Sequence, residues 1–192
     1  MGGEAVDIDE ISPKPDEVGA PVLAAIQSRP LAELATSMMK VSQNQYAELL
    51  LMKIGKPAAR DALRELGIAD DSYIMADGSG LSRYNYVTAD SLVRLLQEMH
   101  RRPAHVSAFV QTLPIVGRDG TLARRLTGTA AEGRVRAKSG TIDNARALSG
   151  YVDTADGETL AFSMIANNFN SSAADIDAAA DKALIRLATF HR

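Results

Sequence analysis

The chain has 192 residues, enough for one domain, or for one domain and a small appendage. With 46% hydrophobic and 23% charged residues, its composition is that of a globular protein and excludes a disordered, collagen-like or coiled-coil chain. The formal net charge of −3 gives no reason to expect nucleic acid or an anionic membrane as the main partner. The absence of cysteine excludes disulfides, thiolate zinc sites and a cysteine nucleophile.

No transmembrane segment is expected, because no apolar run approaches the roughly 20 residues that span a bilayer. Residues 1–10 have neither a basic region nor an apolar core, so they are not a signal peptide. We therefore expect either a cytosolic protein or a chain that starts inside a longer precursor.

Helices are predicted for the first half of the chain. Residues 1–28 read as an acidic, proline-rich, extended lead-in with at most one short helical turn, and the domain proper is expected over 29–192. Apolar residues at three- and four-residue spacing predict a helix from Leu31 that breaks near 42–44 and resumes through Lys53.

Turn signals separate the helices that follow. A short apolar piece at 73–76 enters a turn with two glycines. The further predicted helices are 57–66, closed by Gly67, one capped by Thr88 or Asp90 and stopped by Pro103, and a shorter one around 105–112.

The apolar pattern changes to period two in the last third of the chain. Val135 and Ala137 indicate a first strand, and residues 146–153 and 159–166 predict a hairpin with its turn near Asp156-Gly157. Ser171 or Ser172 is the expected cap of a final helix.

This order predicts an α+β fold, in which a helical region is followed by a three-stranded antiparallel sheet and a C-terminal helix that covers one face of the sheet. Three strands and one covering helix form a thin core, so we expect the sheet to gain further strands from chain that is not present. The isolated chain should then be marginally stable, or should form a homo-oligomer through its exposed sheet edges.

Lys138-Ser139-Gly140-Thr141 is the first candidate site. Its place between strands puts the lysine on an edge strand, beside a glycine that lets another backbone approach. A lysine and a hydroxyl there can bind a substrate carboxylate while the strand pairs with an extended peptide. Taken alone the pattern is weak, since a lysine before a serine and a glycine is usually part of an ordinary loop.

Ser42-Gln43-Asn44, at the helix break, is the second candidate. A serine and an asparagine two residues apart can aim a hydroxyl and an amide at one point, although Ser42 can equally be an ordinary N-cap of the helix starting at Gln45. Penicillin-binding enzymes combine an S-x-x-K nucleophile motif, a second motif of S-x-N type and a K-T-G strand. The second and third of these occur here in the same order.

Five ordered stretches resemble one branch of these enzymes, the D-alanyl-D-alanine carboxypeptidase/endopeptidase family of class C low-molecular-mass penicillin-binding proteins. In the fifth stretch Ser139 stands where the family more often has threonine, and either hydroxyl can serve as a donor. The stretches are Arg29-Pro30-Leu31-Ala32-Glu33-Leu34, Met39-Lys40-Val41-Ser42-Gln43-Asn44-Gln45-Tyr46-Ala47-Glu48, Asp77-Gly78-Ser79-Gly80-Leu81-Ser82-Arg83, Leu113-Pro114-Ile115-Val116-Gly117-Arg118-Asp119-Gly120-Thr121-Leu122 and Arg136-Ala137-Lys138-Ser139-Gly140-Thr141.

The resemblance implies a penicillin-binding/serine β-lactamase-like transpeptidase fold, present in part. It implies a serine-type D-Ala-D-Ala carboxypeptidase or endopeptidase that forms an acyl-enzyme with peptidoglycan stem peptides and is acylated by β-lactams. Ser42 would relay a proton to the leaving amine, Asn44 would hold the substrate amide, and Lys138 would supply positive potential. The hydroxyls expected to grip the terminal carboxylate are those of Ser139 and Thr141, on either side of Gly140.

Two features of the resemblance concern other residues. The glycines between Asp77 and Arg83 suggest a tight turn that Asp77 holds together, and Arg83 either reaches the pocket to bind a charged peptide side chain or forms a structural ion pair. No metal or cofactor is expected, because the three histidines show no metal-ligand spacing. The family's usual place is the periplasm or the outer cell surface.

The nucleophile is the missing part of the resemblance. Ser37-Met38-Met39-Lys40 spells S-x-x-K, but one short segment would then have to supply this pair and Ser42 to opposite sides of one pocket. We expect Ser37 and Lys40 to be structural, and the nucleophilic serine and its lysine to belong to a segment that is not here. The alternatives are a non-catalytic relative that still binds peptidoglycan peptides and a minimal esterase-like site at Ser37 and Lys40.

Overall fold

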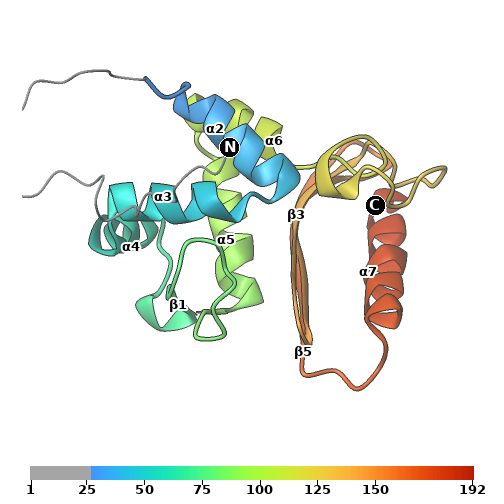
Figure 1. Ribbon diagram of the computed structural model, residues 1–192. Coiled ribbons are helices and arrows are strands. Elements are labelled where there is room, and N and C mark those ends of the chain that lie inside the picture. Colours follow the sequence, from blue (N-terminus) through green and yellow to red (C-terminus); the bar gives the residue numbers. More distant parts are fainter. Residues whose placement is uncertain (1–26) are drawn as a thin grey trace, which may run out of the picture.

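The computed structural model describes residues 27–192 and shows a three-layered arrangement (Figure 1). One layer is helical, with α2 (Leu31–Val41), α3 (Asn44–Ile54), α4 (Lys56–Glu65), α5 (Ala89–His100) and α6 (Pro103–Thr112). The middle layer is a sheet of β3 (Val135–Ile142), β4 (Ala145–Asp153) and β5 (Thr159–Asn167), and the last is α7 (Ala173–Ala188). Shorter elements are η1 (Asp70–Ser72), β1 (Tyr73–Ile74), β2 (Tyr86–Val87) and η2 (Gly120–Leu122).

The helix boundaries follow local capping chemistry. The Thr88 side chain accepts a hydrogen bond from Ser91 N at the start of α5, and Ser172 and Asp175 form a capping box at the start of α7. Pro103 opens α6 two residues before the expected start, because a proline at the first helical position loses no helical hydrogen bond. Each predicted helix after residue 30 is therefore confirmed, and the part of the predicted lead-in at 1–26 lies outside the described residues.

The sheet has the strand order β3-β4-β5 with both pairs antiparallel, as predicted. The β4–β5 turn contains Gly157 at φ 86°, a left-handed conformation that glycine adopts at little cost. Lys138 on β3 lies opposite Ser149 on β4, which lies opposite Ser163 on β5. Lys138 is thus on an edge strand of the described sheet.

Both faces of the sheet are covered, and only one covering element was predicted. On the α7 side, a cluster that includes Val135, Leu148 and Leu184 is buried. On the opposite side, Leu96 of α5 and Leu113 pack on Tyr151 of β4. The α5 periodicity predicts an apolar face, but it does not say which surface that face will cover.

Tyr151 ties the helical layer to the sheet. Its buried hydroxyl donates to the carbonyl oxygen of Leu96 at 2.6 Å, and its ring lies 5.7 Å from that of His100. Burial raises the pKa of Tyr151 to about 12, so the phenol stays protonated as the donor. No helix in the described part of the chain is long and apolar enough to cross a membrane.

Two glycines, Gly140 on β3 and Gly150 on β4, test the packing around the edge strand; each lies opposite an alanine. A Cβ at Gly150 would lie 2.1 Å from the carbonyl oxygen of Arg136, whereas a Cβ at Gly140 would meet only the Ala147 methyl, at 3.5 Å. We expect Gly150→Ala to lower the free energy of unfolding by about 1–3 kcal/mol, as overpacking does. The matched Gly140→Ala variant should be neutral or slightly stabilising in urea denaturation. Equal effects of the two substitutions would contradict the β3–β4 register.

Candidate substrate-binding site

Lys138 and Ser42 meet across the boundary between the sheet and the helical layer. The Lys138 ammonium donates to Ser42 Oγ at 2.8 Å and to the carbonyl oxygen of its neighbour Ser139 at 2.6 Å. The two residues are 96 positions apart in the chain. The structure therefore brings together the two candidate motifs that the sequence could place only in order.

Lys138 is a partly buried cation. Burial lowers its pKa below the ordinary lysine value, because the charged form loses hydration. A partly desolvated ammonium on an edge strand attracts a carboxylate more strongly than a fully hydrated lysine would. This arrangement suits recognition of a terminal carboxylate.

Ser42 ends α2 in a conformation that serine seldom adopts. Its φ of 57° and ψ of 52° are left-handed, and its N–H closes the helix on the carbonyl oxygen of Met38. The N-cap of α3 is Gln43, which makes no side-chain capping bond. The interpretation of Ser42 as an ordinary N-cap is therefore wrong, and its hydroxyl faces Lys138 instead.

Asn44 begins α3 and is exposed, two residues after Ser42. The left-handed turn at Ser42 separates α2 from α3, so both motif residues lie at the junction of these two helices.

Among residues 27–192, the backbone bonds to the outer edge of β3 lie along its first part. Ala137 N donates to Pro114 O at 2.9 Å, and Val135 O accepts from Val116 N at 3.0 Å. Backbone groups of alternate residues in an antiparallel strand point to the same edge. The N–H and C=O groups of Ser139 and Thr141 therefore point outward, beyond the part of the edge that the loop at 114–116 covers.

The loop from Asp77 to Arg83 is held by its own hydrogen bonds, as one interpretation expected. Asp77 accepts from Gly80 N, Ser82 N and the Asn85 amide at 2.6–2.8 Å. Partial burial acts to raise the pKa of Asp77, but these hydrogen bonds outweigh it and hold the pKa below the ordinary value.

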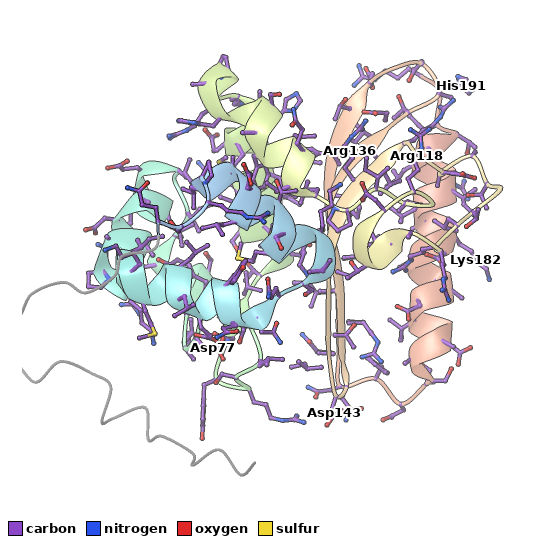
Figure 2. All side chains as sticks on the ribbon, turned by 45° about the horizontal axis from the view of Figure 1, so that its top comes forward. Asp77, Arg118, Arg136, Asp143, Lys182 and His191 are labelled. Carbon is purple, nitrogen blue, oxygen red and sulfur yellow. The ribbon has the colours of Figure 1, made fainter. Side chains whose placement is uncertain are left out.

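Arg83 forms an ion pair, which was one of the two interpretations of this residue. Its guanidinium lies 3.2 Å from Asp143 in the β3–β4 turn, and both side chains are largely exposed. Asp143 stands at the opposite end of the sheet from Arg136 (Figure 2). Arg83 thus lies beside the β3–β4 turn, and such an exposed pair contributes little to stability.

Ser37 and Lys40 do not face each other as a nucleophile and its base. Ser37 is exposed in the middle of α2. The Lys40 ammonium instead donates to Asp119 at 2.6 Å and to the carbonyl oxygen of Leu113 at 2.7 Å. This geometry favours the structural interpretation of both residues.

Two polar contacts near Lys138 were not anticipated. Thr121 Oγ1 lies 3.3 Å from Ser139 Oγ, and the hydroxyls of Ser149 and Ser163 lie 2.8 Å apart in the row that starts at Lys138. The period-two pattern puts Ser149 and Ser163 on one face of their strands, but only the register shows that they continue from Lys138. Within residues 27–192 no group of His, Asp and Glu side chains could hold a metal ion.

A family model and individual relatives match this chain in sequence. Residues 7–188 match the D-Ala-D-Ala carboxypeptidase 3 (S13) family. The chain is similar to a D-alanyl-D-alanine carboxypeptidase of Actinomadura sp. (strain R39), with 41% identity over 188 residues, 89% of this chain and 34% of the relative. It is 32% identical over 165 residues to the D-alanyl-D-alanine carboxypeptidase DacB of Haemophilus influenzae, covering 78% of this chain and 34% of the relative.

Solved structures show the same likeness. Penicillin-binding protein 4 (dacB) from Haemophilus influenzae superposes with a TM-score of 0.76 at 28% identity, over 85% of this chain and 41% of that one. A β-lactamase from Sphaerobacter thermophilus gives 0.64 at 22% identity, over 82% and 60% of the two chains. The fold is thus the penicillin-binding, β-lactamase-like α+β fold that the motifs implied.

The desolvated charge of Lys138 leads to a prediction about stability. We expect Lys138→Met to raise the free energy of unfolding at pH 7, because the folded state then no longer buries a cation. The folded-state pKa is lowered, so this penalty is fully present below that pKa and is lost as the pH rises toward the unfolded value of about 10.4. The stability gained by Lys138→Met should therefore shrink as the pH rises from the folded-state pKa of Lys138 to its unfolded-state pKa, as measured by urea denaturation.

The control is Lys182→Met, which removes an exposed lysine of α7 (Figure 2). A Lys138→Met variant that is less stable than wild type at pH 7, or no more stable than Lys182→Met, would show that Lys138 is not held against a desolvation penalty.

Proposed function

Because the chain belongs to the D-Ala-D-Ala carboxypeptidase 3 (S13) family, we propose that it carries substrate-binding groups of a serine-type D-Ala-D-Ala carboxypeptidase/endopeptidase. The substrates would be peptidoglycan stem peptides, cleaved through an acyl-enzyme, and β-lactams would acylate the same serine. The observation that carries the proposal is the 2.8 Å contact between Lys138 and Ser42. The chain spans about a third of the length of its curated relatives, 34% in the first comparison, and we assign the nucleophilic serine and its lysine to another part of such a protein.

The terminal carboxylate of the peptide binds beside Lys138 in this proposal. Its ammonium supplies the positive charge, and the hydroxyls of Ser139 and Thr141 donate hydrogen bonds. Thr141 is exposed and Ser139 is partly buried, so both hydroxyls lie at the edge where a ligand can reach them. A β-lactam presents a carboxylate to the same groups, and a solved structure of penicillin-binding protein 4 from Haemophilus influenzae holds a β-lactam.

The peptide backbone pairs with the outer edge of β3. The outward-pointing groups of Ser139 and Thr141 accept and donate as in an added strand, and Gly140 contributes no side chain on the approach. Because the loop at 114–116 covers the preceding part of the edge, it fixes where the added strand ends. That limit supports a peptide terminus next to Lys138.

Ser42 and Asn44 act on the bond that is cleaved. The Ser42 hydroxyl accepts from Lys138, which leaves its own proton free to be donated to the leaving amine. The Asn44 amide holds the carbonyl and N–H of the acyl part of the substrate. Arg83, which contacts Asp143 in the β3–β4 turn, would bind an acidic side chain of the peptide in place of that aspartate.

A second candidate function is a non-catalytic relative that binds peptidoglycan peptides. It is favoured by the geometry of Ser37 and Lys40, since the S-x-x-K letters of this chain do not form a nucleophile–base pair. Release of D-alanine by a protein that joins this chain to an S-x-x-K segment distinguishes the two. In either case the site of action would be the cell wall outside the cytoplasm. The outer edge of β5 would pair with another strand of the longer protein or with a second copy of this chain.

Peptide titration tests the proposal on this chain. The affinity for diacetyl-L-lysyl-D-alanyl-D-alanine should be at least about tenfold higher than that for the same peptide with a C-terminal amide, because only the carboxylate pairs with Lys138. Its affinity should fall as the pH rises through the lowered pKa of Lys138, since the neutral amine attracts the carboxylate less. Calorimetry or NMR titration measures both quantities.

The substitutions that accompany this titration are Lys138→Met, which should abolish the preference for the carboxylate, and Lys182→Met, which should keep it. Equal affinity for the acid and the amide, or an unchanged preference in Lys138→Met, would refute carboxylate recognition at this site.

A further inference from the structure

Lys40 lies two residues before Ser42 and is anchored across the layer boundary. Its ammonium donates to Asp119 Oδ2 at 2.6 Å and to Leu113 O at 2.7 Å, and its side chain is only 18% exposed. An ion pair of this kind is worth more than one on the open surface, because solvent screens it less. It fixes the last turn of α2, from which Ser42 projects.

Asp119 is itself fixed by the loop that carries it. Its Oδ1 accepts from Ile115 N at 2.7 Å, while its own N–H donates to Ile115 O at 3.1 Å. The neighbouring residues of this loop are bonded to β3, through Ala137 N to Pro114 O and Val116 N to Val135 O. The carboxylate that holds Lys40 is therefore connected directly to the strand that carries Lys138.

Gly120 brings the two backbones into contact. A Cβ at this position would lie 2.5 Å from the carbonyl oxygen of Lys40, and φ is +59°. The next residue, Thr121, places its hydroxyl 3.3 Å from that of Ser139. Within three consecutive residues the loop thus contacts the α2 end and the substrate-binding edge.

We propose that Asp119, acting through Lys40, is a positioning residue that sets the separation of Ser42 and Lys138. Ser42 sits in a left-handed turn that the chain could relax, and the Lys40–Asp119 pair keeps this turn against β3. The pair does not touch the substrate in this arrangement. Its effect on catalysis rests on the proposed function, whereas its effect on the Ser42–Lys138 contact does not.

The test removes the ion pair without changing the net charge. In the double variant Lys40→Met/Asp119→Asn, the asparagine Oδ1 can still accept from Ile115 N, so the loop keeps its own turn. The control is Arg125→Met/Asp181→Asn, which removes a comparably buried arginine–aspartate pair that joins Arg125 to α7, with side chains 18% and 27% exposed. Both variants replace one cation and one carboxylate, and the control also loses the longer 4.0 Å pair between Arg125 and Asp177. Only the first variant borders the site.

Two readouts report on the site. The pH dependence of Lys138 acetylation, followed by mass spectrometry, gives the pKa of Lys138, and peptide titration gives the affinity for D-alanyl-D-alanine. In Lys40→Met/Asp119→Asn the pKa of Lys138 should return toward the ordinary value of about 10.4, because burial is what lowers it and water then reaches the ammonium. The peptide should bind about tenfold more weakly. The control should change neither.

A glycine pair gives a second, independent perturbation if the ion-pair variant does not fold. Gly120→Ala pushes the loop away from Lys40, whereas Gly128→Ala has a similar φ of +76° and nothing within 4 Å of the added Cβ. Gly120→Ala should shift the Lys138 pKa upward and weaken peptide binding, and Gly128→Ala should share only the backbone strain.

Folded Lys40→Met/Asp119→Asn or Gly120→Ala proteins with the wild-type pKa of Lys138 would overturn the proposal. So would equal shifts in a variant and its control, which would indicate general loosening. If wild-type protein does not bind the peptide, the proposed function fails, and the Lys138 pKa alone still decides whether Asp119 positions the pair.

Discussion

The site depends on one contact, the hydrogen bond from the Lys138 ammonium to the Ser42 hydroxyl. It joins the edge of the sheet to the end of the first described helix, and neither partner is in a relaxed state. Lys138 gives up part of its hydration, which lowers its pKa, and Ser42 adopts a left-handed backbone that costs a non-glycine residue about 1–2 kcal/mol. The surrounding fold must supply the energy that keeps both in place.

The two layers supply it through packing and a few directed bonds. Tyr151 connects the sheet to α5 with a buried hydrogen bond, and the opposite face of the sheet packs on α7 through Leu184. Nearer the site, the Lys40–Asp119 pair and the close approach of Gly120 hold the end of α2 against the loop at β3. Strain concentrated at binding groups and offset by a rigid framework is a common arrangement at functional sites.

The elements themselves could be predicted from the sequence because their signals are local. Capping residues, prolines and apolar periodicity located the α-helices after residue 30 and the three long strands within a few residues, but not the short pair β1 and β2. The motif order pointed to Ser42 and Lys138 as one site, although their contact across 96 positions is a tertiary fact. What the sequence could not show was the second covering layer on the sheet, since an apolar helix face does not name its partner.

Individual side chains were harder to assign than elements. The role of Lys40 depends on Asp119, which lies 79 positions away, and no local pattern predicts such a pair. For Arg83 the sequence left two readings, because an exposed arginine beside a turn can meet either a ligand or a neighbouring carboxylate. For Ser42 the sequence likewise left two interpretations, a site residue and a helix N-cap, since the same residue type serves both roles.

Intact-mass spectrometry of this chain after incubation with benzylpenicillin tests the central claim most directly. If Ser42 is held by Lys138 as a proton-relaying and binding group, and Ser37 has no lysine base, the chain keeps its unmodified mass. A stoichiometric adduct that maps to Ser37 or Ser42 would contradict the account, because one of these residues would then be the nucleophile.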